Sequence, residues 1–123
     1  MVNIKVKRVY EQRAEADGYR VLVDRIWPRG LSKKDVRVDV WLREVAPSDT
    51  LRKWFAHDPA KWEEFKSRYA KELESNKEFE RLLQLVRGKE IVTLVYSAKD
   101  TEHNQAVALK TLLEERLKRS TQK

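Results

Sequence analysis

Polar side chains that could support chemistry are concentrated in two short segments, each placed directly after an apolar run. The first segment is DRIWPRG, residues 24–30, and the second is YSAKDTEHN, residues 96–104. The runs before them, residues 21–23 and 91–95, are typical of buried strands. Ligands of open α/β sheets bind outside the carboxyl ends of the strands. We therefore expect both segments to lie at one edge of a sheet and to form one site.

The basic residues of these segments indicate a site for an anion. Arginine binds a phosphate or carboxylate through two parallel hydrogen bonds, and lysine adds a point charge. The second segment also leads into a helix, whose unpaired N–H groups favour an anion. The predicted anion-binding residues are Arg25, Arg29, Lys99, Ser97 and Asn104. The alternative is that the arginines form structural ion pairs with Asp24, Asp58 or Asp100.

Two residues of the same segments, Asp24 and His103, are candidates for acid–base catalysis. His103 is predicted in the first turn of the final helix, where the helix dipole favours a neutral imidazole that can accept a proton. Ser97 lies where a nucleophile could sit, but the GxSxG motif is absent and a hydroxyl that stabilises a turn is the favoured interpretation. His57, His103 and an aspartate could together bind a metal. With two histidines in the chain and no paired ligand motif, no metal site is predicted.

Other classes of site are excluded by what the sequence lacks. There are no cysteines, which rules out disulfides, thiolate metal sites and cysteine nucleophiles. Neither GxxxxGK[ST] nor GxGxxG is present, so a standard nucleotide-binding loop is not supported and no cofactor is predicted. The apolar stretches are too short for a signal peptide or a membrane span. We therefore expect a cytoplasmic protein with no membrane partner.

The charge of the chain permits a nucleic-acid partner but does not favour one. The 123 residues include 27 Lys and Arg against 20 Asp and Glu, which gives a net charge of +7. Because acidic and basic residues are interleaved, we favour a solvated mixed-charge surface and expect only weak, sequence-independent nucleic-acid binding. Charged residues make up 38% of the chain. Such a composition is typical of heat-adapted proteins, so we predict a thermostable protein.

We predict one α/β domain over residues 1–123, with an open, mostly parallel sheet covered by helices. Strands are predicted at residues 4–10, 20–27 and 91–96. The last of them is apolar on both faces and belongs in the centre of the sheet, between parallel neighbours. Helix N-caps are predicted at Ser48, Asp58 and Asp100. Residues 31–47 fit either a short strand or a helical turn, the final helix spans 101–119, and residues 120–123 form a frayed tail.

Five segments of the chain also resemble the signature of a known family. They are DRIWPRG, WLREVAPS, LRKWFAHDP, WEEFKSRY and LVYSAKDTEHNQA. Together they are similar to the YeaO-like family, bacterial and archaeal proteins with a domain of unknown function (488), and the similarity extends over residues 4–117. The resemblance implies an α/β fold and a shared site built from these segments. It implies no substrate and no reaction.

The residues therefore favour a site for a small anionic ligand such as a phosphate or a nucleotide, either in a binding domain or in an enzyme. Two other classes stay open: a nucleic-acid-binding module, and a structural or interaction domain. Convergence of the predicted basic residues with His103 in a concave pocket would favour the small ligand. Basic residues on a convex face with exposed aromatic side chains would favour nucleic acid.

Overall fold

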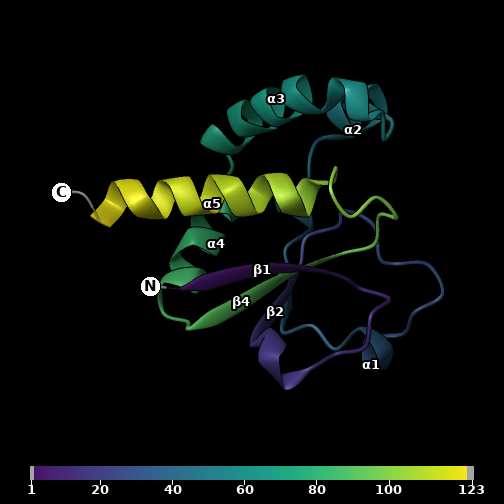
Figure 1. Cartoon of the computed structure of the whole chain (residues 1–123), viewed down its shortest axis with the longest axis vertical. Coiled ribbons are helices and arrows are strands. Elements are labelled where there is room, and N and C mark those ends of the chain that lie inside the picture. The colour runs from purple at the N-terminus through teal and green to yellow at the C-terminus, as the bar shows by residue number, and fades with distance from the viewer. Residues whose placement is uncertain (1, 122–123) are drawn as a thin grey trace.

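Within residues 2–121, which the computed structural model describes, four parallel strands form one sheet and five α-helices accompany it (Figure 1). The strands are β1 (Asn3–Arg8), β2 (Tyr19–Leu22), β3 (Val40–Trp41) and β4 (Ile91–Tyr96). The helices are α1 (Lys33–Val36), α2 (Asp49–Phe55), α3 (Trp62–Glu74), α4 (Lys77–Arg87) and α5 (Gln105–Thr121). The strand order is β1-β4-β2-β3. Because every pairing is parallel, the carboxyl ends of the strands meet at one edge.

The central strand is β4, as its apolar sequence predicts. It pairs along its whole length with β1 and, on its other side, with β2. Residues 92–96 are all buried. A strand between two neighbours in a covered sheet must be apolar on both faces. The predictions of a mostly parallel α/β sheet and of a central strand at 91–96 are thus confirmed.

Both faces of the sheet are covered, but unequally. In Figure 1, α5 runs along one face with α3 beyond it, whereas α1 lies on the opposite side. The larger core includes buried side chains from the sheet and from α3, α4 and α5, such as Leu94, Tyr69, Leu83 and Leu109. The smaller core consists of Val9, Leu22, Val36 and Val95, with Trp27 and Trp41 packed against them. This second core fixes the segments that leave the carboxyl edge.

The connection between β4 and α5 is longer than predicted. Helix α5 begins at Gln105, and Asn104 caps it by accepting a hydrogen bond from an amide of the first turn at 3.0 Å. Asp100 instead accepts hydrogen bonds from the amides of Glu102 and His103, both at 2.9 Å, and closes a separate turn. The predicted N-cap at Asp100 is therefore wrong. His103 lies in the loop before the helix, not in its first turn.

Other boundaries differ less from the prediction. Strand β2 ends at Leu22, earlier than predicted, and residues 31–47 contain both a helical turn, α1, and a short strand, β3. The predicted caps at Ser48 and Asp58 are confirmed, because each side chain accepts a hydrogen bond from a backbone amide of the following turn. Helix α5 continues through residues 120 and 121, where a frayed tail was expected, and residues 122 and 123 lie outside the described residues. Among the helices described, none has the length and apolar character needed to cross a membrane.

Candidate functional site

A pocket of about 210 Å³ lies at the carboxyl edge of the sheet. We call it the inner pocket. It is lined by Asp24, Arg25, Ile26, Ala46, Pro47, Arg52, Phe55, His57, Phe65, Ser97, Ala98, His103, Asn104 and Gln105. One side comes from the two polar segments that follow β2 and β4. The other side comes from α2, α3 and the residues next to α2, so the pocket lies between the sheet edge and the helical layer.

Asp24 is the buried carboxylate of this pocket, with 6% of its surface exposed. Its Oδ1 accepts a hydrogen bond from Gln105 Nε2 at 2.5 Å. Its Oδ2 is buried and has no hydrogen-bond partner among the described residues. Burial raises the pKa of Asp24 above its ordinary value, and the nearby Ser97 hydroxyl and amide, with Gln105, offset part of that rise. An unsatisfied buried carboxylate oxygen destabilises a protein, and a proton or a ligand donor would satisfy it.

The backbone around Asp24 is held firmly. The amide of Val23 donates to the carbonyl of Val95 at 3.1 Å, which extends the pairing with β4 beyond the end of β2. The indole N–H of Trp41 donates to the Asp24 carbonyl at 2.6 Å. Asp24 therefore leaves the sheet in a fixed direction, as a binding residue on a rigid element should.

Arg25 has a structural role in the pocket wall. Its Nε donates to the Pro47 carbonyl at 3.2 Å and its Nη2 to the Ala46 carbonyl at 3.1 Å, while Nη1 lies 3.5 Å from Glu44 Oε2. The guanidinium thus fixes the segment before α2. It pairs with none of the aspartates that the sequence offered as alternatives. Tyr69 supports the same segment, since its hydroxyl donates to the Val45 carbonyl at 2.6 Å.

The two histidines line the same pocket. The Nδ1 of His103 is 2.9 Å from Asp100 Oδ2, and its ring meets Trp62 edge-on, with centroids 5.3 Å apart. Hydrogen bonds from the amides of Glu102 and His103 lower the pKa of Asp100, so His103 faces a charged carboxylate. His57 is exposed and has a left-handed backbone, with φ 57°. Among residues 2–121, no group of three or more side chains is arranged to hold a metal ion.

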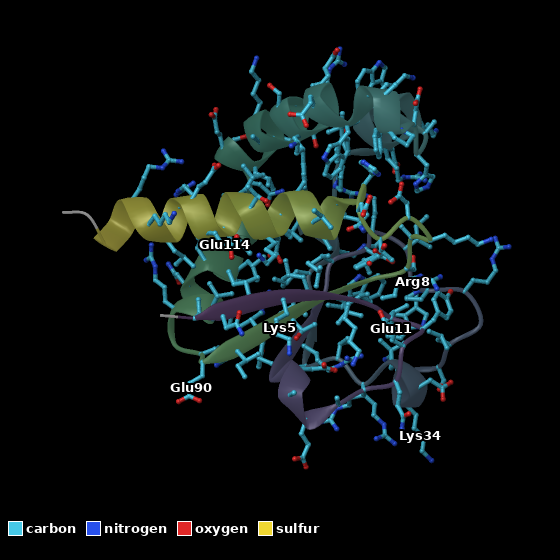
Figure 2. The ribbon with its side chains drawn as sticks, in the orientation of Figure 1. Lys5, Arg8, Glu11, Lys34, Glu90 and Glu114 are labelled. Atoms are coloured by element: carbon cyan, nitrogen blue, oxygen red, sulfur yellow. The ribbon has the colours of Figure 1, made fainter. Side chains whose placement is uncertain are left out.

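A second, more open depression of about 580 Å³ adjoins the inner pocket. We call it the outer hollow. Its lining residues are Arg8, Tyr10, Ile26, Trp27, Pro28, Arg29, Ser97 and Lys99. Figure 2 labels Arg8 at the carboxyl end of β1, far from Glu90 at the opposite end of the sheet. Ile26 and Ser97 line both cavities, so the inner pocket and the outer hollow border each other at these two residues.

The cations of the outer hollow differ in their contacts. Arg8 donates to the carbonyls of Ala98 and Ser97, at 2.9 and 3.2 Å, and its guanidinium lies 4.8 Å from the centre of the Tyr10 ring. Arg29 and Lys99 are exposed, and their charged groups have no partner among the described residues. The Tyr10 hydroxyl donates to the Arg29 carbonyl at 2.9 Å. The loops that carry both unpaired cations are thus anchored through their backbones.

The structure divides the predicted site residues between the two cavities. The inner pocket contains Asp24, Arg25, His103 and Asn104. The outer hollow contains Arg29 and Lys99, and Ser97 lines both. Asn104 is buried, and its amide is used to cap α5 and to donate to the Asp100 carbonyl at 2.9 Å. The predicted basic residues therefore do not converge on a single point.

Sequence reasoning missed several residues of the pocket. Gln105 donates a hydrogen bond to the Asp24 carboxylate, and its position at the start of α5 was the one available signal. Arg52 and Phe55 reach the pocket from α2. Phe55 is buried, as its helical spacing with Leu51 indicated, but that spacing gives no sign of a pocket.

The comparison with known proteins gives a family and no activity. The family model that matches is described as the inactive DUF488-N3 subclade, and it covers residues 3–123. An uncharacterised protein of Mycobacterium tuberculosis strain H37Rv is 44% identical over 110 residues, 89% of this chain and 92% of that protein. The uncharacterised protein YeaO of Escherichia coli K12 is 42% identical over 108 residues, 88% of this chain and 94% of YeaO. No solved structure gives a significant match.

These matches confirm the resemblance drawn from the five sequence segments. The family model spans nearly the whole chain, and the relatives align over most of their own length. The chain belongs to the YeaO-like DUF488 family, within the subclade described as inactive DUF488-N3.

Proposed function

We propose that this protein is a binding domain for a small anionic ligand and that the inner pocket receives part of that ligand. The observation that carries the proposal is the Oδ2 atom of Asp24, a buried carboxylate oxygen with no hydrogen-bond partner among the described residues. Folded proteins satisfy nearly all of their buried polar atoms, so an exception in a pocket wall points to a function. A ligand group that donates a hydrogen bond would supply the missing partner.

The surroundings of Asp24 favour a ligand with an apolar body. The rings of Phe55 and Phe65 stack with centroids 4.3 Å apart and line the pocket together. Pockets for small molecules are commonly apolar, with a few polar groups that set orientation. The anionic part of the ligand is supported by the positive charges near the pocket, with Arg52 in its lining and Arg29 and Lys99 in the adjoining hollow.

Binding is favoured over catalysis by the contacts of the two candidate acid–base groups. His103 is paired with Asp100, and Asp24 is bound by Gln105. Within residues 2–121, no hydrogen bond joins Asp24 to His103. The description of the matched subclade as inactive agrees with a binding role.

The test is a thermal-shift titration of the wild type and Asp24→Asn against nucleoside monophosphates, sugar phosphates and amino acids. Glu90→Gln is the matched control, because it removes one carboxylate charge at the opposite end of the sheet. We expect at least one compound to raise the Tm of the wild type and of Glu90→Gln with the logarithm of its concentration. Asp24→Asn should show a much smaller shift. A shift that Asp24→Asn retains in full, or no shift with any compound, would contradict the proposal.

A further inference from the structure

We infer that the outer hollow is the phosphate subsite of the same ligand site, and that the ligand is a phosphate monoester with a flat, amine-bearing head, such as a nucleoside monophosphate. The head would occupy the inner pocket and the phosphate would bind Arg29 and Lys99. This inference rests on the proposed function, because it assigns the two ends of one ligand to the two cavities.

The first support is that the two cavities are adjacent. Ile26 and Ser97 line both of them, so the cavities border each other and one ligand could contact both. Ser97 also lies next to the Asp24 carboxylate, whose charged form it favours. Ser97 therefore borders both the pocket that contains Asp24 and the hollow that contains Arg29 and Lys99.

The second support is that two of the three cations in the outer hollow have no partner for their charge among the described residues. Arg8 is already engaged with two carbonyl groups and with the Tyr10 ring. Arg29 and Lys99 are exposed without a partner for their charge among the described residues, while the backbones beside them are anchored by Tyr10 and Arg8. Two cations that line one hollow repel each other unless an anion offsets them. A phosphate accepts charge-assisted hydrogen bonds from both side chains and supplies that offset.

The third support is the opposite character of the inner pocket. A phosphate placed beside Asp24 would meet a carboxylate, whereas an amine or a ring N–H would donate to its unsatisfied oxygen. The stacked rings of Phe55 and Phe65 offer an apolar wall to a flat head. Charge thus fixes the direction of the ligand, with the donor end inside and the phosphate outside.

The experiment measures Kd by isothermal titration calorimetry for adenosine, cytidine and guanosine, for their 5′-monophosphates, for inorganic phosphate and for a single-stranded hexanucleotide. The variants are Arg29→Ala/Lys99→Ala, Asp24→Asn and the control Lys71→Ala/Arg119→Ala, which removes the same charges from exposed positions that line neither cavity. Circular dichroism and the Tm of each variant verify that it is folded.

We expect at least one monophosphate to bind the wild type roughly tenfold or more tightly than its nucleoside, as charge-assisted hydrogen bonds would give. Arg29→Ala/Lys99→Ala should erase that preference and leave the affinity for the nucleoside unchanged, and Asp24→Asn should weaken both. The control should behave as the wild type does.

The contrary outcomes separate the two proposals. Equal affinity for nucleoside and monophosphate, with both lost in Asp24→Asn, would overturn the phosphate subsite and leave the proposed function standing. If the preference for the monophosphate were unchanged in Asp24→Asn, the shared site and the role of Asp24 would be overturned. Much tighter binding of the hexanucleotide than of any monophosphate would replace the small ligand with a nucleic acid. If none of the probes bound, the inference and the class of ligand that it names would both be overturned.

Discussion

Two buried carboxylates lie at opposite ends of β2, and their surroundings differ in almost every respect. Asp17 precedes the strand and accepts hydrogen bonds from the Ala14 amide, from Lys7 Nζ and from Arg20 Nη1, the last at 2.7 Å. Asp24 follows the strand, and its Oδ1 accepts a hydrogen bond from Gln105 while its Oδ2 has no partner among the described residues. Both are nearly inaccessible to solvent, at 3% and 6% exposure. Burial alone therefore does not distinguish them.

Their ionisation follows from these contacts. Burial on its own raises the pKa of Asp17, but the hydrogen bonds from Ala14, Lys7 and Arg20 outweigh it and the pKa is lowered. At Asp24 burial outweighs the hydrogen bonds, and the pKa is raised. The comparison separates a carboxylate whose partners all lie within the protein from one whose set of partners is incomplete. The first stabilises the fold, and the second marks the pocket.

The largest expected effect on the free energy of unfolding comes from a substitution at Asp17. Asp17→Asn leaves the guanidinium of Arg20 buried without its counter-charge, although two backbone carbonyls still bind it. Breaking a buried ion pair by removing one partner costs about 3–5 kcal/mol. We expect a loss of that order in the free energy of unfolding, measured by urea denaturation at neutral pH. A loss below about 1 kcal/mol would show that the pair is not structural.

The next effect is at Arg25. Arg25→Ala removes the donors that satisfy the buried carbonyl groups of Ala46 and Pro47, and each unsatisfied buried group costs about 1–3 kcal/mol. We expect the free energy of unfolding to fall by about 2 kcal/mol. Lys53→Ala, at an exposed position on α2, is the control and should change it little. If Arg25→Ala were as stable as the control, Arg25 would be available for a ligand instead.

A substitution at Asp24 is expected to have a smaller effect on the free energy of unfolding, and one of opposite sign. The raised pKa means that the charged form is disfavoured in the folded state, so the penalty is absent below pH 3.8, grows as the pH rises toward the folded-state pKa, and is constant above it. Asp24→Asn removes this penalty. We expect it to raise the free energy of unfolding at neutral pH by about 1 kcal/mol, with the gain declining in acid. Urea denaturation over pH 3 to 8 measures it, and a loss that grows with pH would be the contrary result.

The smallest effect is at Arg29. Its side chain is exposed without an ion-pair partner in the described residues, so Arg29→Ala should change the free energy of unfolding by less than about 0.5 kcal/mol. The measurement is the same denaturation experiment without ligand. A loss similar to that of Arg25→Ala would mean that Arg29 also holds the fold together. The outer hollow would then lack one of its two unpaired cations.

The sequence predicts which strands and segments form the site better than it predicts the contacts of individual side chains. The two-sided apolar run at 91–96 identified the central strand, and the strand-end rule located both polar segments at the carboxyl edge. The roles of Arg25 and Arg29 could not be separated, because the groups that bind Arg25 are backbone carbonyls distant in the chain. The segment also turns between the two arginines, where the Trp27 indole donates to the Leu31 carbonyl at 2.7 Å.

The difference between Asp17 and Asp24 could not be predicted from the sequence either. Gly18 follows Asp17 and adopts a left-handed φ of 63° just before β2 begins. Nothing in the spacing showed that Arg20, three residues later in a strand, would be buried against Asp17. His103 was placed in a helix because Asp100 resembles an N-cap, yet Asp100 closes its own turn. Arg20 is held in that position by the carbonyls of Arg37 and Val36, which are distant in the chain, whereas at His103 two neighbouring cap residues competed.

The most direct test is to follow the side-chain carboxyl carbons of Asp17 and Asp24 by NMR through one pH titration of the ligand-free protein. We expect Asp24 to titrate above the ordinary value of 3.8 and Asp17 below it. That result would establish that β2 carries a fully partnered carboxylate at one end and an incompletely partnered one at the other. An Asp24 that titrates at or below 3.8 would mean that its carboxylate is already satisfied within the protein, and it would contradict the assignment of Asp24 to a ligand.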